Sequence, residues 1–162
     1  MKRQPLTIID YNSLVLAYHD ESDRSAIVLA GSFAEQYLAT YLRHHMIDDP
    51  DVEQLFERGA LASFDARIRV AYAFRLISRT QHDDLRLVKD IRNRFAHSPQ
   101  MIDLQQKDVK AMIKGLTVYH RLHSPEVPSI VQKSERHIYL YTIGLFIVFA
   151  HNAMLRSNQP QT

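Results

Sequence analysis

The residues best suited to chemistry lie close together, in the hexapeptide RNRFAH at positions 92–97. Arg92 carries a planar guanidinium whose fork donates two hydrogen bonds to phosphate oxygens. His97 carries the side chain whose pKa lies nearest neutral pH, so it can accept and release protons in catalysis. Asn93, one helical turn before His97, can hold the imidazole by a hydrogen bond and choose its tautomer. Together these residue types indicate a phosphate-directed acid–base site.

The sequence around the hexapeptide, residues 84–99, predicts an amphipathic helix that stops abruptly. Val88, Ile91 and Phe95 recur at spacings of three and four residues, which places one apolar stripe along a helix. A residue that precedes proline is pushed out of the α region. Because a proline follows two residues after His97, the helix should end near His97, with the polar groups of the hexapeptide crowded at its end.

Charged residues occupy the other side of this predicted helix. Arg86, Asp90 and Arg94 are each four residues from the next, so they can form a ladder of ion pairs. Lys89 and Arg94 are the candidate side chains for contacts with nucleic acid on this helix.

A structural role explains the same residues. On an ideal helix Arg92 and His97 point about 140° apart, so one hexapeptide does not direct both at one phosphate. A histidine in the last turn is favoured there because imidazolium interacts well with the helix dipole. Arg92 can pair with Glu35, an acidic residue on an earlier predicted helix, and tie the two helices together. The sequence leaves the catalytic and the structural interpretations open.

Two resemblances to known families rest on these residues. The spacing Arg92-Asn93-x-x-x-His97 resembles the R-x(4–6)-H signature of HEPN domains. A longer match resembles the mannitol-repressor (MtlR-like) family, which carries a G-x-L-x-S-F-x-x-[KR]-I-x-x-A-Y-A block and then an I-R-x-I-R-N-x-F-A-H-S block. The corresponding segments here are GALASFDARIRVAYAF at 59–74 and LVKDIRNRFAHS at 87–98, with Val88-Lys89 as a mild departure. The matching region covers roughly residues 25 to 100.

Each resemblance implies a different function. The longer one ranks first and implies a transcriptional regulator; because the chain has no helix-turn-helix signature, such a regulator would act through a partner protein. The HEPN resemblance implies a metal-independent endoribonuclease that works as a dimer, with two motifs facing a shared cleft. It also implies an acidic side chain facing Arg92, and Glu35 is the candidate. As a nucleic-acid partner, RNA ranks ahead of direct reading of DNA. A plain helical interaction module is a third possibility.

Composition limits the class of protein. The chain has 162 residues, enough for one domain with a sizeable core, and no cysteine, so a disulfide framework and thiolate metal sites are excluded. No apolar run occurs in the first ten residues, and the longest one, residues 138–150, is shorter than the roughly twenty that span a membrane. His120 and His123 are three residues apart, but no third metal ligand is evident. We therefore expect a cytoplasmic protein without cofactor or metal, not bound to a membrane.

Charge is spread unevenly along the chain, although the net charge is only +2. Residues 1–57 carry four Lys/Arg and ten Asp/Glu, a net −6, whereas residues 58–97 are at +5 and residues 98–162 at +3. A basic bias admits nucleic acid as a partner. It equally admits association between copies through the acidic third, and the charge alone favours neither. A homodimer is expected because the HEPN resemblance implies one.

Long periodic segments with few glycines and no hairpin signals predict an all-α bundle of six to seven helices, and the resemblance stated above implies that it is HEPN-like. The predicted domain is 1–156, with a last helix that is apolar on nearly all sides and therefore central or at a subunit interface, followed by a disordered tail at 157–162. The expected helices are 7–19, 25–47, 52–58, 64–78, one from Thr80 or Asp83 to near His97, 107–122 and 129–156.

Overall fold

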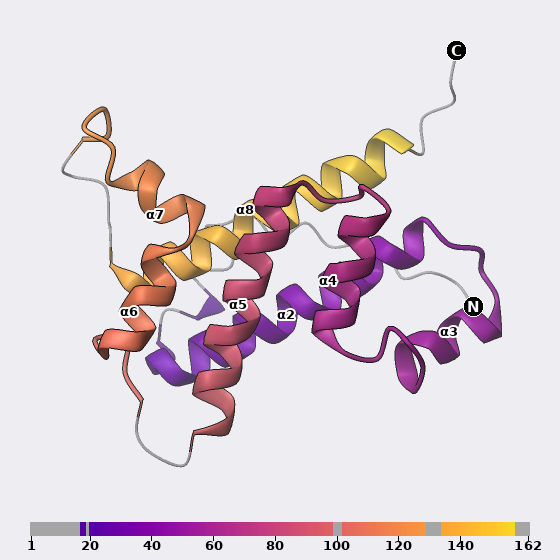
Figure 1. Ribbon diagram of the computed structural model, residues 1–162, viewed down its shortest axis with the longest axis horizontal. Helices are drawn as coiled ribbons and strands as arrows, with labels where there is room; N and C mark the ends of the chain where they lie inside the picture. Colours follow the sequence, from indigo (N-terminus) through magenta and orange to yellow (C-terminus); the bar gives the residue numbers. More distant parts are fainter. Residues whose placement is uncertain (1–16, 19, 99–101, 129–133, 158–162) are drawn as a thin grey trace.

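The computed structural model describes residues 17–18, 20–98, 102–128 and 134–157. Its described part is built from seven α-helices and contains no strand, which confirms the predicted all-α bundle (Figure 1). The helices are α2 (Asp23–His44), α3 (Pro50–Glu57), α4 (Phe64–Ala73), α5 (Arg79–His97), α6 (Lys107–Lys114), α7 (Thr117–Leu122) and α8 (Glu135–Ser157).

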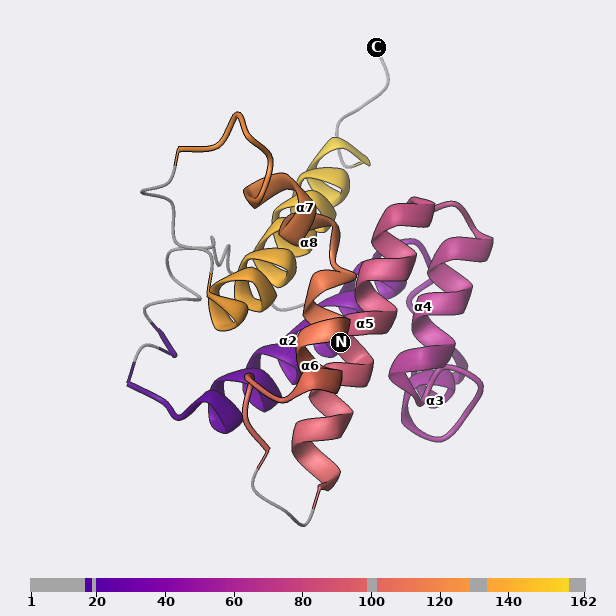
Figure 2. The ribbon, with the colours of Figure 1, turned by 60° about the vertical axis from the view of Figure 1, so that its left-hand side comes forward.

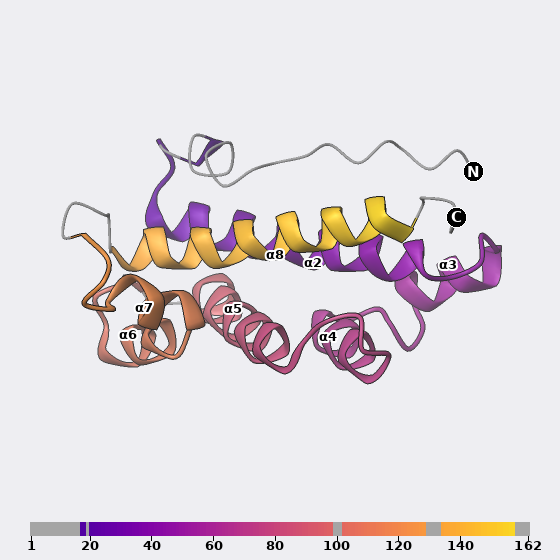
Figure 3. The same cartoon turned by 90° about the horizontal axis from the view of Figure 1, so that it is seen from above.

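The helices form two layers. The long helices α2 and α8 run side by side in one layer, and α4, α5 and the short pair α6 and α7 cross it in the other (Figure 3). Figure 2 shows α5 between α4 on one side and α6 on the other, so α5 is the central helix of its layer. The arrangement packs α5, whose last six residues are the hexapeptide, against α2.

The apolar stripe predicted on α5 forms part of the core. Val88, Ile91 and Phe95 have no exposed surface, and they pack with Ile27 of α2 and Tyr139 of α8, which are also fully buried. Burying a large apolar side chain stabilises a fold by about 1.5–3 kcal/mol. These contacts lock α5 in one rotation about its axis, and that rotation decides which way the polar residues of the hexapeptide point.

Three serines set where α2, α4 and α5 begin. The Oγ atoms of Ser22, Ser63 and Ser78 each accept a hydrogen bond from the backbone N–H three residues later, at 3.1–3.2 Å. At Ser78 a capping box is complete, since the Oε1 atom of Gln81 accepts from the Ser78 backbone N–H at 2.8 Å. Ser22 and Ser63 are therefore the caps of α2 and α4, and α5 starts earlier than predicted because Ser78 is its cap.

The helix predicted at 64–78 is shorter than expected and ends at Ala73. The cap residue of α5, Ser78, is extended (φ −72°, ψ 168°), so a helix cannot run through it. Arg75 in the connection has a φ of 57°, in the left-handed region that only a few per cent of non-glycine residues adopt. The chain therefore turns sharply between α4 and α5.

The single helix predicted at 107–122 is wrong: it is two helices, α6 and α7. Leu116 between them is extended (φ −69°, ψ 138°) and fully buried. No side chain near in sequence caps α7; instead a carboxylate oxygen of Asp84, on α5, accepts from the Thr117 backbone N–H at 2.9 Å. A cap supplied by another helix is invisible to local patterns, which explains the error.

Other boundaries differ by a few residues. The helix α2 ends at His44 rather than 47, and α3 starts at Pro50, where the prediction placed a turn. Proline suits the first turn of a helix, and the Oδ1 atom of Asp49 accepts from the backbone N–H two residues on at 2.8 Å. Short polar stretches such as 48–51 thus allow either a turn or a capped helix start.

Three predicted segments lie outside the described residues. They are most of the predicted helix 7–19, residues 129–133 at the start of the predicted last helix, and residues 158–162 of the predicted tail. Ser134 precedes α8, and its Oγ accepts from the His137 backbone N–H at 3.2 Å, as a cap does. Ser157, placed in the tail by the prediction, is the last residue of α8.

The last helix is central in the core, as predicted. Tyr139 and Ile143 are fully buried, and Ile138 and Leu140 nearly so. By length and composition alone α8 could cross a membrane, with a mean hydropathy of 1.7 over eighteen residues, but 61% of that window is buried inside the protein. Such burial is typical of a core helix.

Candidate functional site

The helices α2 and α5 touch at a glycine. A Cβ atom built on Gly31 would lie 2.6 Å from the Tyr139 Oη and 2.7 Å from both the Cβ and the Cγ of Arg92. Real Cβ atoms do not approach other atoms so closely, so only glycine permits this crossing. The close approach brings Arg92 of α5 alongside α2, within reach of Glu35 one turn further on.

Arg92 and Glu35 form an ion pair between the two helices. The Nη2 atom of Arg92 donates to the Oε2 atom of Glu35, while Nη1 donates to the Oδ1 atom of Asn93 at 2.8 Å. Both side chains are mostly buried, with 17% and 21% of their surface exposed. The guanidinium also lies 5.9 Å from the centre of the Phe64 ring. The predicted position of Glu35 opposite Arg92 is therefore what the fold contains.

One nitrogen of this arginine has no partner. The Nε atom of Arg92 is buried and hydrogen-bonded to no atom in the described part of the chain. Tyr139, close enough to touch a Cβ at Gly31, uses its hydroxyl to donate to the backbone carbonyls of Ile27 and Val88. Burial raises the pKa of this phenol, so Tyr139 is a neutral donor inside the core rather than a base.

A second arginine, Arg67 on α4, belongs to the same cluster, and sequence reasoning missed it. Its Nη1 lies 3.5 Å from the Oε1 atom of Glu35, so one carboxylate serves two guanidinium groups. Its other donors hold the loop before α4: Nε reaches the Leu61 carbonyl at 2.8 Å and Nη2 the Ala62 carbonyl at 3.3 Å. Burial lowers the pKa of Arg67 below its usual value, although the Glu35 carboxylate opposes this shift.

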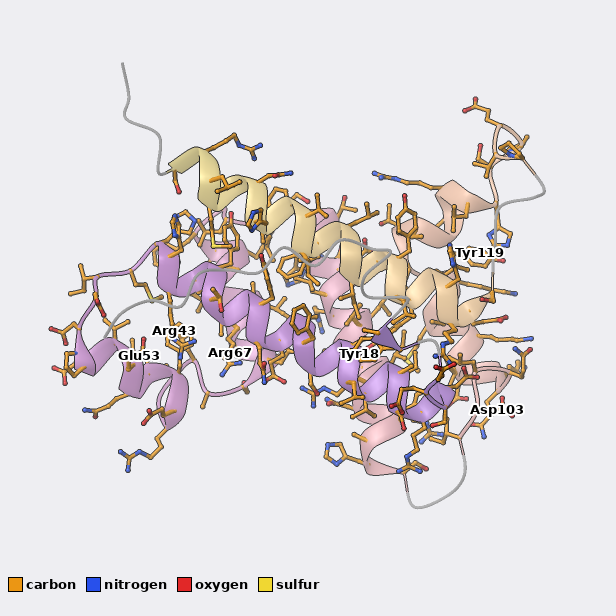
Figure 4. The ribbon with its side chains drawn as sticks, turned by 180° about the vertical axis from the view of Figure 1, so that it is seen from behind. Tyr18, Arg43, Glu53, Arg67, Asp103 and Tyr119 are labelled. Atoms are coloured by element: carbon orange, nitrogen blue, oxygen red, sulfur yellow. The ribbon has the colours of Figure 1, made fainter. Side chains whose placement is uncertain are left out.

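The signal for Arg67 was present in the sequence. It stands at the basic position of the segment that resembles the first mannitol-repressor block, GALASFDAR at 59–67. Arg67 binds the loop inside the block, and Ser63 caps the helix that carries Arg67. Its role here is to join α2, α4 and the loop between α3 and α4. Figure 4 shows Arg67 near Arg43 and Glu53, where α2 meets α3.

His97 lies outside this cluster. It is the last residue of α5 and is exposed. The Oδ1 atom of Asn93, predicted to orient the imidazole, is instead occupied by Arg92 at 2.8 Å. Beside the helix end, the Nη2 atom of Arg24 donates to the Ser98 carbonyl at 3.3 Å and so satisfies a helix-end carbonyl. The structure joins Arg92, Asn93 and Glu35 and leaves His97 apart from them.

The two candidate nucleic-acid contacts are both neutralised by carboxylates. The Nζ atom of Lys89 lies 2.7 Å from Asp65 and 3.3 Å from Asp90, with 15% of the side chain exposed. Its hydrogen bond holds the pKa of Asp65 below the usual range. Arg94 pairs with Asp108 of α6 at 3.0 Å. Asp90 and Arg94 thus pair with Lys89 and Asp108, and not with each other as the predicted ladder of Arg86, Asp90 and Arg94 requires.

Metal coordination has no support in the described part of the chain, where no group of three or more His, Asp or Glu side chains lies close enough to hold an ion. His123 is engaged locally: its Nδ1 lies 2.8 Å from the Tyr119 carbonyl, and its ring stacks on that of Tyr119 with centroids 4.1 Å apart.

The arrangement supports a limited chemistry. For Arg92 to bind a phosphate, its guanidinium must exchange Glu35 and Asn93 for the ligand, because those residues occupy two of its donors. His97 is accessible to a ligand without rearrangement. Comparison with known proteins adds no relative: no family model, no curated protein and no solved structure matches the chain.

Proposed function

We propose that this chain is a cytoplasmic regulator of the mannitol-repressor type, which controls transcription by binding another protein rather than by reading DNA. The resemblance of segments 59–74 and 87–98 to that family motivates the regulatory role. The observation that carries the mode of action is the pairing of the cations Lys89 and Arg94 with carboxylates.

Binding to a nucleic acid draws most of its free energy from cations that replace the counterions around phosphates. A lysine that must first leave two carboxylates, as Lys89 must, contributes little. The same holds for Arg67 and Arg92, which share Glu35. A protein partner does not require these paired cations to leave their carboxylates, so it is the binding mode that suits the charge arrangement on α4 and α5.

The test is the affinity for duplex DNA of mixed sequence, measured by fluorescence anisotropy over a range of salt concentration. Weak binding with a shallow salt dependence is expected. The control variant Asp108→Asn releases Arg94, which is half exposed, and should strengthen the binding and steepen its salt dependence by about one counterion. Tight, steeply salt-dependent binding by the wild type would contradict the proposal.

A regulatory role is tested in cells that lack the protein. Synthesis and decay of messenger RNA are measured separately, by pulse labelling. A regulator changes synthesis rates of a limited set of transcripts and leaves half-lives unchanged. If half-lives change instead, the second candidate below is favoured.

That second candidate is a metal-independent endoribonuclease, which the accessible His97 and the set formed by Arg92, Asn93 and Glu35 favour. His97 would take the proton of a ribose 2′-OH while its oxygen attacks the adjacent phosphorus. The bond to the 5′-oxygen breaks, and that oxygen receives a proton from the His97 of a second copy. The products are a 2′,3′-cyclic phosphate and a 5′-hydroxyl end, and Arg92 would stabilise the charge on the phosphorus centre.

Cleavage of mixed RNAs in the presence of a chelator tests this candidate. His97→Ala is the decisive variant because the side chain is exposed, and His120→Ala, another exposed histidine, is its matched control. Activity that is lost only in His97→Ala and that leaves cyclic phosphate ends would establish the ribonuclease. Equal background in all three proteins would eliminate it.

A further inference from the structure

A groove runs along the surface where the connection from α4 to α5 meets α8. Two adjacent cavities form it, of about 660 and 430 Å³, and both are lined by Ser78, Gln81 and Phe149. The first extends to Tyr72 and Arg75, and the second to α7 and α8. The groove is therefore a continuous feature of the fold, built by three separate elements.

The surface of the groove combines exposed apolar side chains with cations. Tyr72 and Leu145 line it and are each 37% exposed, and Phe74, between two lining residues, is 73% exposed. Arg75 and Arg121 also line it, and no ion pair within 4 Å is formed by either of them in the described residues, although Arg121 lies close enough to the Asp84 carboxyl, which also lines the groove, to oppose the burial that raises the pKa of that group. Exposed apolar surface next to exposed cations is typical of a binding site for an acidic, amphipathic segment.

The chain itself presents a surface of that kind on α3 and the turn before it. The inner face of α3 is held to α2, because Glu53 binds Arg43 at 3.0 Å and the Arg43 guanidinium lies 3.9 Å above the buried Phe56 ring. The outer surface carries exposed carboxylates and two exposed apolar side chains. This acidic edge consists of Ile47, Asp48, Asp51, Leu55 and Glu57.

The two surfaces are complementary in charge and in exposed apolar area. The most exposed large apolar side chains of the described residues are Ile47 and Phe74, at 73% each, and one lies on each surface. Asp51 and Glu57 form no ion pair within the described part of the chain. The groove thus supplies the positive charge and the acidic edge the negative charge, and both surfaces expose apolar side chains.

Their placement allows the contact to be made twice. The acidic edge precedes the start of α4, and the groove begins where α4 ends (Figure 1). Two copies related by a two-fold axis across α4 would place each acidic edge against the groove of the other copy. A two-fold interface is self-complementary, so one pair of surfaces gives two identical contacts and the assembly closes.

We propose that the groove between the α4–α5 connection, α7 and α8 binds the acidic edge around α3 of a second copy of this chain. The occupant is a second copy because its surface is on the same molecule, opposite in charge and placed for a reciprocal contact. This assembly is independent of the regulatory role proposed above, since a dimer can form whatever the chain controls.

Reversing the charges of the groove in one variant and those of the acidic edge in another tests whether the two surfaces bind each other. Sedimentation velocity over a range of concentration should show a dimer for the wild type, with a dissociation constant that rises with salt. The variants Arg75→Glu/Arg121→Glu and Asp51→Lys/Glu57→Lys should each raise that constant about tenfold or more, since like charges then face each other. An equimolar mixture of the two variants should form a heterodimer, because each groove then meets an edge of opposite charge.

All substituted side chains are exposed, so folding should be preserved, which circular dichroism verifies; Lys107→Glu, an exposed reversal outside both surfaces, is the matched control and should leave the dimer unchanged. A wild type that stays monomeric overturns the proposal, as does a dimer that neither variant weakens. Failure of the mixture to associate overturns it as well.

The absence of cysteine permits an independent check by cross-linking. Leu55→Cys protein mixed with Phe74→Cys protein should be joined by a short bismaleimide. Lys107→Cys in place of Phe74→Cys should give no cross-linked dimer. Cross-linking of Leu55→Cys to Lys107→Cys but not to Phe74→Cys would place the interface elsewhere.

Discussion

Arg92 and His97 lie five residues apart on one helix, yet their surroundings are opposite. Arg92 is mostly buried, and its terminal nitrogens are bound by Glu35 and Asn93. His97 is exposed at the end of α5. The packing of α5 against α2, not the spacing in the motif, decides what each residue can do. A motif defined by residue types thus divides into a structural part and an accessible part.

The largest effect should come from removing the carboxylate at the structural end. Glu35→Ala leaves Arg92 and Arg67 mostly buried without their shared counter-charge, and we expect a loss of about 3 kcal/mol in the free energy of unfolding. Urea denaturation measures it. The matched control is Glu53→Ala, which breaks the more exposed pair with Arg43 and should cost less than about 1 kcal/mol. Equal losses of unfolding free energy in Glu35→Ala and Glu53→Ala would mean that the Glu35 cluster is no more important for stability than an exposed ion pair.

A smaller loss is expected from Gly31→Ala. The added methyl group would clash with Arg92 and Tyr139 at 2.6–2.7 Å and push α2 from α5. Overpacking of this kind costs about 1–3 kcal/mol, which outweighs the gain of about 1 kcal/mol in helix propensity. Thermal unfolding should show a lower melting temperature, whereas the neighbouring Ser32→Ala should change it little. Unchanged stability in Gly31→Ala would mean that the helices are not in close contact there.

At the other end of α5, Asp84 should make stability depend on pH. Burial raises the pKa of this carboxyl, although the Thr117 hydrogen bonds oppose the shift. The folded chain thus binds the proton more tightly than the unfolded chain, so this group's contribution to stability improves as the pH falls through its folded pKa and is lost as the pH rises.

The variant Asp84→Asn should remove that pH dependence and be at least as stable as the wild type at neutral pH, because the amide oxygen still accepts from Thr117. Asp84→Ala loses the cap of α7 and should cost about 1 kcal/mol. Denaturation at several pH values separates the two. If both variants are destabilised equally, the charge itself is what α7 requires.

The smallest effect belongs to the accessible end. His97→Ala should change the free energy of unfolding by no more than about 0.5 kcal/mol, as is usual for exposed positions. The same urea experiment measures it beside Glu35→Ala. A loss comparable to that of Glu35→Ala would show that His97 packs into the structure.

The sequence predicted features that depend on local pattern. The apolar stripe of α5 and its end at His97 follow from periodicity and residue type alone. Glu35 opposite Arg92 was predicted through a family resemblance, and the fold contains that pair.

Features that depend on contacts between helices could not be predicted. The break between α6 and α7 rests on Asp84, thirty-three residues before Thr117. Arg67 joins the cluster because α4 folds against α2. The close approach of α2 to α5 depends on Gly31, which lies against Arg92 and Tyr139. Each depends on a partner that no local window contains.

The central claim is that Arg92 is a structural residue held by Glu35, whereas His97 is accessible. A double-mutant cycle between Glu35 and Arg92 tests this claim most directly. The variants Glu35→Gln, Arg92→Met and the double variant are unfolded by urea beside the wild type. A coupling energy of about 2 kcal/mol or more is expected, since the pair is mostly shielded from solvent. A coupling energy near zero would contradict the account, because Arg92 would then be free for a ligand.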